Sequence, residues 1–197
     1  MIQIPSLRQI AERKLANAIL YFVGNTNDCY KTKLVKLVYY ADVIKLARSG
    51  KPLFGLEYQA WKFGPVPVDL FREFGDIQRS FFYQFFDVKE QTIADSTKKF
   101  FKIVPKRAPD LKVFSRAEKA VLDEIVEVFK EASGMDMVNS THEWDEPWTK
   151  TWKTLGEGTV IDKLSVVNAF TGRLEQEELS ELYDYYQNTL RLQSDKR

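Results

Sequence analysis

The sequence predicts a mainly α fold with a small antiparallel β-sheet, that is, an α+β protein. Apolar residues recur at helical spacing in several long stretches, and short aromatic segments bracketed by Gly and Pro lie between the N-terminal and C-terminal helices. The 197 residues suit a single domain, and 14 Phe, 9 Tyr and 4 Trp supply the bulk of one dense core.

Two helices are predicted before residue 50. The first spans residues 7–23, and Ser6 and Gln9 have the spacing of a capping box at its start. The second spans residues 29–49 and carries apolar residues along two stripes, which is typical of a central, buried helix. Gly50 is expected to end this helix, because glycine readily takes the left-handed conformation at a helix C-terminus.

Short extended segments are predicted after the second helix. Strands are expected at residues 57–63, 81–88 and 99–104, which together would form the small antiparallel sheet. Between the first two strands, residues 68–74 are predicted to form a short helix that begins after Pro65 and Pro67.

Helices return in the C-terminal half. Ser115 and Glu118 form a second capping box, and the following apolar residues predict a helix that Ser133 and Gly134 stop. Residues 135–143 predict a short helix, residues 156–158 a turn, and residues 179–190 a last helix. We assign residues 1–155 to the main domain and residues 156–197 to a C-terminal helical extension packed on the same domain.

Composition and charge exclude several classes of protein. The formal net charge of +1 gives no strong field toward nucleic acid or membranes. No stretch reaches the roughly 20 apolar residues of a membrane helix, and the first five residues lack the pattern of a secretion signal. The single cysteine, Cys29, cannot form an internal disulfide, which fits a reducing compartment. We expect a cytoplasmic protein with no membrane partner.

A basic run over residues 98–107 also contains Phe100 and Phe101. Basic and aromatic residues together are found in proteins that bind single-stranded nucleic acid. In a nearly neutral protein, however, such lysines and those of the second helix more commonly form a solvated face. Nucleic acid is therefore not an expected partner, and no Gly-rich phosphate loop indicates a nucleotide cofactor.

One set of residues offers a possible catalytic site. Cys29 lies near a helix N-terminus, where the helix dipole can lower the pKa of a thiol. Either Cys29 or Ser140 could act as a nucleophile with His142, the only histidine. No oxyanion loop accompanies them, and one histidine without spaced cysteines is a poor metal site. We expect a structural histidine and no catalytic, metal or cofactor site, with a thiol or serine hydrolase as an alternative.

Asp42 lies within the most apolar helix. An unpaired carboxylate is costly there, so Asp42 either faces a gap in the core or accepts hydrogen bonds from a donor such as Trp61, Lys62 or His142. We favour a structural role, in which the carboxylate holds neighbouring segments together.

Two groups of aromatic residues are candidates for a partner-binding surface. Alternate residues of a strand point to opposite faces, so the aromatics of residues 81–86 are either buried on both sides or left open to a partner on one. The last helix carries the second group. The candidates are Phe81, Phe82, Tyr83, Phe85, Phe86, Tyr183, Tyr185 and Tyr186.

Several motifs, in their order and spacing, closely resemble one family. The chain carries LVKLVYYAD at residues 34–42, AWKFGPV at residues 60–66 and LFREF at residues 70–74, followed by a Ser-Thr-His segment at 140–142 and Pro-Trp at 147–148. Together they resemble the Panacea domain, the SocA-like antitoxin domain also found in phage-associated proteins. The resemblance covers about residues 13–155.

The resemblance implies a mainly helical domain with a small β element, and an antitoxin that neutralises its cognate protein toxin by direct binding. The SocA branch instead delivers its toxin to a protease, so a proteolytic adaptor with a cellular protease as partner is the alternative. The family has no established catalytic residues, so an enzyme is not expected, and the oligomeric state is left open. The motif residues are expected to be structural, with Trp61 and Phe63 packed on the helix that carries Asp42: Asp42, Trp61, Lys62, Phe63, Gly64, Pro65, His142, Pro147 and Trp148.

Overall fold

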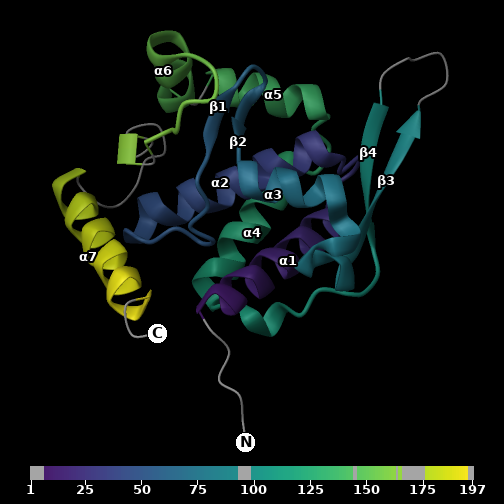
Figure 1. Ribbon diagram of the computed structural model, residues 1–197, viewed down its shortest axis with the longest axis horizontal. Helices are drawn as coiled ribbons and strands as arrows, with labels where there is room; N and C mark the ends of the chain where they lie inside the picture. Colours follow the sequence, from purple (N-terminus) through teal and green to yellow (C-terminus); the bar gives the residue numbers. More distant parts are fainter. Residues whose placement is uncertain (1–6, 93–98, 144–145, 163, 166–175, 195–197) are drawn as a thin grey trace, which may run out of the picture.

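The computed structural model describes residues 7–92, 99–143, 146–162, 164–165 and 176–194 (Figure 1). Within them, seven α-helices and two antiparallel sheets of two strands each confirm the predicted fold class. The elements are α1 (Leu7–Asn25), α2 (Lys31–Ser49), β1 (Gln59–Trp61), β2 (Gly64–Val66), α3 (Val68–Glu73), the 3₁₀ segments η1 (Phe74–Arg79) and η2 (Phe81–Gln84), β3 (Phe86–Thr92), β4 (Lys99–Pro105), the 3₁₀ segment η3 (Leu111–Val113), α4 (Arg116–Phe129), α5 (Gly134–Glu143), α6 (Glu146–Leu155) and α7 (Gln176–Ser194).

Helix α2 forms the centre of the fold. It contacts α1, α4 and α5, and the β1–β2 hairpin lies against it (Figure 1). Thirteen of its nineteen residues are buried, as the two apolar stripes predict. Gly50 ends the helix in the left-handed conformation at φ 68°, and its N–H donates to the carbonyl of Leu46 over 2.8 Å. The predicted buried helix is confirmed, although it begins at Lys31 rather than at residue 29.

Two lysines of α2 are buried rather than solvated. Lys33 is 0% exposed and Lys36 is 1% exposed. The Lys33 ammonium donates to the carbonyls of Asn27 (2.7 Å), Lys130 (3.1 Å) and Ala132 (2.6 Å). The predicted solvated face is therefore wrong for these two lysines, because backbone carbonyls replace water as the partners of the charge.

The second capping box is confirmed, but the end of its helix differs from the prediction. Ser115 Oγ accepts the N–H of Glu118 (3.3 Å), and Glu118 Oε2 accepts the N–H of Ser115 (2.8 Å). Helix α4 ends at Phe129. Ser133 then caps α5, because its Oγ accepts the N–H of Asp136 (3.1 Å). Ser133 therefore begins the next helix rather than stopping α4.

The other predicted helices agree with the structure to within a few residues. Helices α1, α3, α5 and α7 occupy the expected segments, and the predicted turn at residues 156–158 has glycines with φ 88° and φ 82° at its two ends. The expected Ser6 cap of α1 lies outside the described residues.

The strands form two separate hairpins rather than the single predicted sheet. Lys62 and Phe63 make a tight turn, so the chain reverses at once and Trp61 pairs with Gly64. The segment 158–161 runs along the other side of β1. Its backbone forms hydrogen bonds with the backbone of Tyr58 and Ala60, the two neighbours of Gln59. The β3–β4 hairpin lies elsewhere, at the right of Figure 1.

Residues 81–84 form the 3₁₀ segment η2, not the predicted strand. Ser80 caps the segment by accepting the N–H of Phe82 through its side chain (3.1 Å). The rings of Phe82, Phe85 and Phe86 are all buried, and their spacing of three and four residues is that of a helical turn. Aromatic residues that are adjacent in sequence therefore face the core together without the alternation of a strand.

Helix α7, at the left of Figure 1, packs against the C-terminal end of α2. A Cβ built on Gly50 would overlap the side chain of Leu182, so glycine allows α7 to approach closely. The Lys51 ammonium lies 5.5 Å from the centre of the Tyr186 ring. The assignment of residues 156–197 as an extension remains a prediction.

Candidate functional site

The aromatic cluster of η2 is mostly internal. Phe82, Phe85 and Phe86 are at most 5% exposed, so a partner cannot reach them in this fold. Phe81 and Tyr83 remain, at 37% and 39% exposed. The Lys106 ammonium lies 2.9 Å from the centre of the Tyr83 ring and donates to the Tyr83 carbonyl over 2.8 Å, which covers part of this ring.

The tyrosines of α7 divide into inner and outer residues. Tyr183 and Tyr186 are partly buried, and burial raises the pKa of both hydroxyls. Tyr185 is 74% exposed and Leu182 is 40% exposed. Tyr183 and Tyr186 therefore face the body of the domain, whereas Tyr185 faces solvent.

Asp42 holds the connection between α2 and β1. Its carboxylate accepts the backbone N–H groups of Phe54 (2.5 Å), Gly55 (3.1 Å) and Leu56 (3.0 Å), and the hydroxyl of Tyr58 (3.0 Å). Burial first, and the charge of Asp42 second, raise the pKa of Tyr58 well above its ordinary value. The donors belong to the loop that follows α2, so the predicted donors Trp61, Lys62 and His142 are wrong.

The second half of the β1–β2 hairpin is pressed against α2 and α5. Gly64 and Pro65 are buried, and the Lys36 ammonium donates to the Pro65 carbonyl over 2.8 Å. Gly64 has φ 97°, and a Cβ built on it would lie 2.6 Å from Thr141 Oγ1 and 2.7 Å from Lys36 Nζ. Glycine is therefore required at this position.

Three stacked rings lie beside the hairpin. His142 stacks on Trp148 with ring centres 4.0 Å apart, and Trp152 stacks on Trp148 with ring centres 5.6 Å apart. Trp148 is buried beside Pro147, and its Nε1 donates to the Trp61 carbonyl over 3.0 Å. Partial burial, and to a lesser degree the Lys36 ammonium, lower the pKa of His142, which favours the neutral ring.

The turn of the same hairpin faces solvent. Phe63 is 55% exposed, so the expectation that it packs on α2 is wrong. The reason is local: residues 62 and 63 form the turn itself, and only the strand residues on either side reach the core. Trp61 does pack inward, with its ring centre 5.2 Å from that of Phe71.

Further apolar side chains are exposed beside this turn. Leu155 is 68% exposed and Val160 is 49% exposed. Their segment is tied to the hairpin, because Glu157 accepts the N–H of Lys62 (3.3 Å) and Val160 forms a bridge with Gln59. We call Lys62, Phe63, Trp152, Leu155 and Val160 the hairpin patch.

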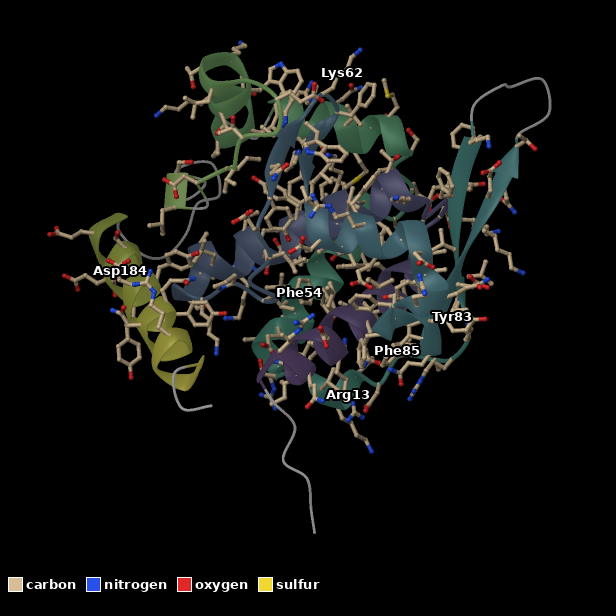
Figure 2. The ribbon with its side chains drawn as sticks, viewed as in Figure 1. Arg13, Phe54, Lys62, Tyr83, Phe85 and Asp184 are labelled. Carbon is tan, nitrogen blue, oxygen red and sulfur yellow. The ribbon has the colours of Figure 1, made fainter. Side chains whose placement is uncertain are left out.

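The candidate surfaces lie far apart. Figure 2 places Lys62 of the hairpin patch, Tyr83 of η2 and Asp184 of α7 on different sides of the molecule. The hairpin patch was not predicted from the sequence, because the motif around Phe63 was assigned entirely to the core. The signal that could have revealed it is the two-residue spacing between Trp61 and Gly64, which permits only a tight, exposed turn.

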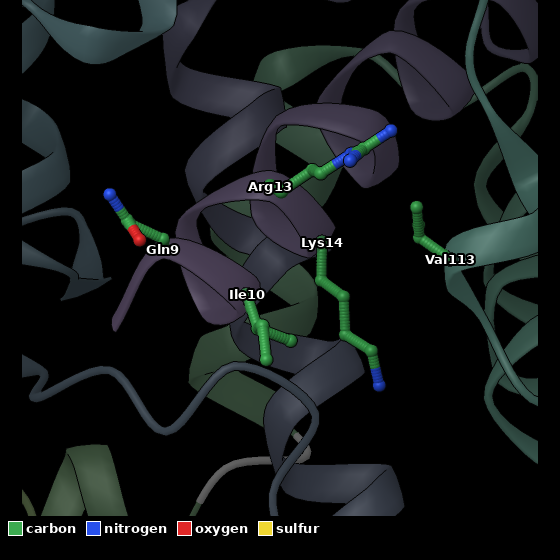
Figure 3. Close-up of a pocket in the computed structure, with 5 residues that line it drawn as sticks. All are labelled: Gln9, Ile10, Arg13, Lys14 and Val113. Carbon is green, nitrogen blue, oxygen red and sulfur yellow. The ribbon is translucent and has the colours of Figure 1, made fainter. Parts of the chain in front are cut away.

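A shallow hollow of about 220 Å³ lies between α1 and η3 (Figure 3). Its two cations are already paired: Arg13 with Asp110 (3.5 Å) and Lys14 with Glu118 (2.6 Å). The hollow thus offers mainly the apolar parts of side chains. The residues that line it include none of the predicted site residues; they are Gln9, Ile10, Arg13, Lys14 and Val113.

The proposed nucleophiles are buried. Burial raises the pKa of Cys29 to about 11, opposite to the lowering expected from a helix N-terminus. Ser140 Oγ donates to the Met137 carbonyl (3.0 Å) and shares a hydrogen bond with the Tyr40 hydroxyl (2.9 Å). These contacts are structural ones and do not activate either group.

We expect Cys29 to react slowly with a thiol reagent while the protein is folded. Because the thiolate is the reactive form, a pKa of about 11 leaves on the order of one thiol in 10⁴ ionised at pH 7. Labelling with a chromogenic disulfide should be at least about tenfold slower in the folded protein than in denaturant. Equal rates would contradict the burial of Cys29 and favour the hydrolase alternative.

The fold and the surface together define a class of domain. It is a mainly α domain in which a β-hairpin sits on a buried central helix, with apolar side chains exposed at the hairpin turn. None of the described helices has the length and apolar character needed to cross a membrane.

Comparison with protein families identifies the domain. The model of the family "Antitoxin SocA-like, Panacea domain" matches residues 34–149, which include most of α2, both hairpins and the stacked pair of His142 and Trp148. The chain therefore belongs to this family, as the resemblance indicated. This membership supports an antitoxin role, and implies in general a toxin as partner. No curated protein and no solved structure matches the chain.

Proposed function

We propose that this protein is an antitoxin that neutralises its cognate protein toxin by direct binding. The observation that carries the proposal is membership in the SocA-like antitoxin family over residues 34–149. Binding and not catalysis is the proposed mechanism, and the buried thiol of Cys29 and the internally bonded Ser140 support this choice.

We further propose that the hairpin patch contributes to the toxin interface. A specific interface buries about 1,600 Å² in total, and large aromatic side chains near its centre dominate its energy. Phe63 is an aromatic residue on a rigid turn, since Gly64 and Trp61 on either side are fixed by α2 and Trp148. A preorganised aromatic side chain loses little conformational entropy on binding.

Replacement of Phe63 by Ser is expected to weaken neutralisation without unfolding the protein. The ring is 55% exposed, so its loss should change stability by less than about 0.5 kcal/mol. The toxin should be the growth-arresting protein encoded beside this gene, and its affinity should fall about 10- to 100-fold. Growth rescue on co-expression and titration calorimetry measure the two effects.

Val128→Ser is the matched control, because Val128 is 57% exposed on α4 and lies outside the hairpin patch. Equal affinities of the Phe63→Ser and Val128→Ser variants would remove the hairpin patch from the interface. If no neighbouring protein is toxic, or the purified pair does not associate, the antitoxin proposal itself fails.

The adaptor and the hydrolase predict different results in the same system. An adaptor lowers the amount of toxin in cells and needs a protease, whereas direct binding inhibits the purified toxin without one. A hydrolase needs its nucleophile, so Cys29→Ser, Ser140→Ala and His142→Gln should abolish neutralisation while leaving toxin binding intact. We expect all three variants to neutralise the toxin.

A further inference from the structure

The β3–β4 hairpin has one covered side and one open side. Strand β4 contacts α1 and α2, and Lys102 of this strand bridges to Tyr30. Beyond its partner strand, β3 makes its main contacts with η1 and η2, and Figure 1 shows it as the outermost strand. Its residues 89–92 are all exposed.

The hydrogen-bond pattern shows which backbone groups of β3 face the open side. The N–H of Lys106 donates to the carbonyl of Phe85 over 2.9 Å, and this pair continues the register of the hairpin. In an antiparallel ladder, hydrogen-bonded and non-hydrogen-bonded pairs alternate. Lys89 and Gln91 therefore bond to β4, while residues 88, 90 and 92 direct their N–H and C=O groups outward.

Of the outward backbone N–H groups of β3, that of Val88 is already bonded, and those of Glu90 and Thr92 are open among the described residues. Asp87 Oδ1 accepts the N–H of Val88 over 2.8 Å, which agrees with an outward direction for this amide. In the part of the chain that the structure describes, no neighbour takes up the N–H groups of Glu90 and Thr92. An unpaired strand edge of this kind can accept a further strand.

Two lysines lie side by side at this edge, and the nearby carboxylate of Asp87 is bonded to the N–H of Val88. Lys89 lies directly opposite Lys102 in the hairpin register, and like charges at such positions are mutually destabilising. By contrast, Glu90 is already paired with Lys99 at 3.0 Å. An added acidic residue next to Lys89 would compensate the two lysines.

A second copy of this chain is a poor occupant of the edge. Antiparallel pairing centred on Glu90 or on Lys89 would place that central residue against its own copy, with like charges opposed. Pairing centred on Val88 would need the Val88 N–H, which already donates to Asp87 Oδ1. Pairing centred on Gln91 would use only residues 90–92 of β3, which ends at Thr92. The charge pattern therefore favours a different protein.

We propose that the outer edge of β3 receives an extended segment of the partner toxin, with an acidic residue opposite Lys89. This inference rests on the proposed antitoxin function. In an added antiparallel strand, the residue opposite Lys89 belongs to a non-hydrogen-bonded pair, in which side chains lie closest. The backbone bonds at Glu90 and Thr92 supply affinity, and Lys89 with Lys102 selects the acidic segment.

The decisive variant is Glu90→Pro, compared with Glu90→Ala. Proline lacks an N–H, and an edge strand tolerates it where that N–H faces solvent. Both variants lose the ion pair with Lys99, but only Glu90→Pro loses the outward donor. We expect Glu90→Pro to lower the affinity for the neighbouring toxin at least 100-fold, and Glu90→Ala less than fivefold, with both proteins folded by circular dichroism.

A second measurement tests the pairing without a substitution. Amide hydrogen exchange of the free protein should be slow at Lys89 and Gln91 and fast at Glu90 and Thr92, and toxin binding should slow the latter two. Lys89→Glu should weaken binding about tenfold or more. If the toxin binds the wild type but protects neither amide, or binds Glu90→Pro and Glu90→Ala equally, the edge is not the docking site while the antitoxin function stands. If the toxin does not bind the wild type, the proposed function fails first.

Discussion

Replacement of Asp42 by Ala is expected to lower the free energy of unfolding by about 3–5 kcal/mol. The carboxylate is fully buried and accepts four hydrogen bonds, three of them from consecutive backbone amides. Its removal leaves those three amides without this acceptor, whereas the Tyr58 hydroxyl keeps its longer contact with the Val38 carbonyl (3.3 Å). Each unpaired buried donor costs about 1–3 kcal/mol, although local relaxation recovers part of the sum.

Asp42→Asn is the informative companion. Asn keeps the size of the side chain but presents one carbonyl and one amide group, so at least one backbone donor meets another donor. We expect a loss between that of Ala and the wild type, measured by urea unfolding. In a domain of this size, a loss of 1 kcal/mol lowers the melting temperature by about 2–4 °C. A melting temperature of Asp42→Ala within 2 °C of the wild type would contradict the role of the carboxylate.

The position of Asp42 links stability to function. The amides that it binds belong to residues 54–56, and β1 begins three residues later at Gln59, so the carboxylate holds the segment that leads into the hairpin. The hairpin in turn carries Phe63 at its exposed turn. We therefore expect Asp42→Ala to weaken toxin neutralisation indirectly, with a loss that follows the unfolded fraction.

Most helices were predicted from the sequence because their signals are local, although α6 (Glu146–Leu155) was not predicted. The stripes of α2, the glycine at position 50 and the Ser115 capping box each act within one or two helical turns. The strands were predicted less well, since adjacent aromatics at 81–86 fit both a strand and a 3₁₀ turn. Only the cap from Ser80 and the burial of Phe82 and Phe85 distinguish the two.

The buried lysines of α2 and the open edge of β3 could not be predicted for a related reason. Burial of Lys33 and Lys36 depends on carbonyls brought from residues far along the chain, which no local pattern contains. The same holds for the open edge of β3, because its exposure depends on where α1 and α2 pack. The motif segments that identify the family belong to the shared fold. The charged residues of β3 lie outside those motif segments, between residues 74 and 140. Partner choice can therefore change while the fold is kept.

Gly64 shows how strongly the hairpin motif is constrained. Its φ of 97° is rarely adopted by residues with a Cβ. The surrounding space is closed as well, by Thr141 Oγ1 and Lys36 Nζ. A methyl group here must displace both the Thr141 hydroxyl of α5 and the buried Lys36 ammonium, which donates to the Pro65 carbonyl. Neither group can move to water, so strain and lost hydrogen bonds add.

We therefore expect Gly64→Ala to lower the free energy of unfolding by about 3 kcal/mol or more. Gly24→Ala is the matched control, because Gly24 lies in the last turn of α1, where a methyl group on its Cα would have no atom within 4 Å. The control should be neutral or stabilising by up to about 1 kcal/mol, since Ala favours a helix. Both variants carry the same chemical change. Urea unfolding should show a large loss in the free energy of unfolding for Gly64→Ala and little change or a small gain for Gly24→Ala. A Gly64→Ala variant as stable as Gly24→Ala would mean that the hairpin is not held against Lys36, and the rigid presentation of Phe63 would lose its basis.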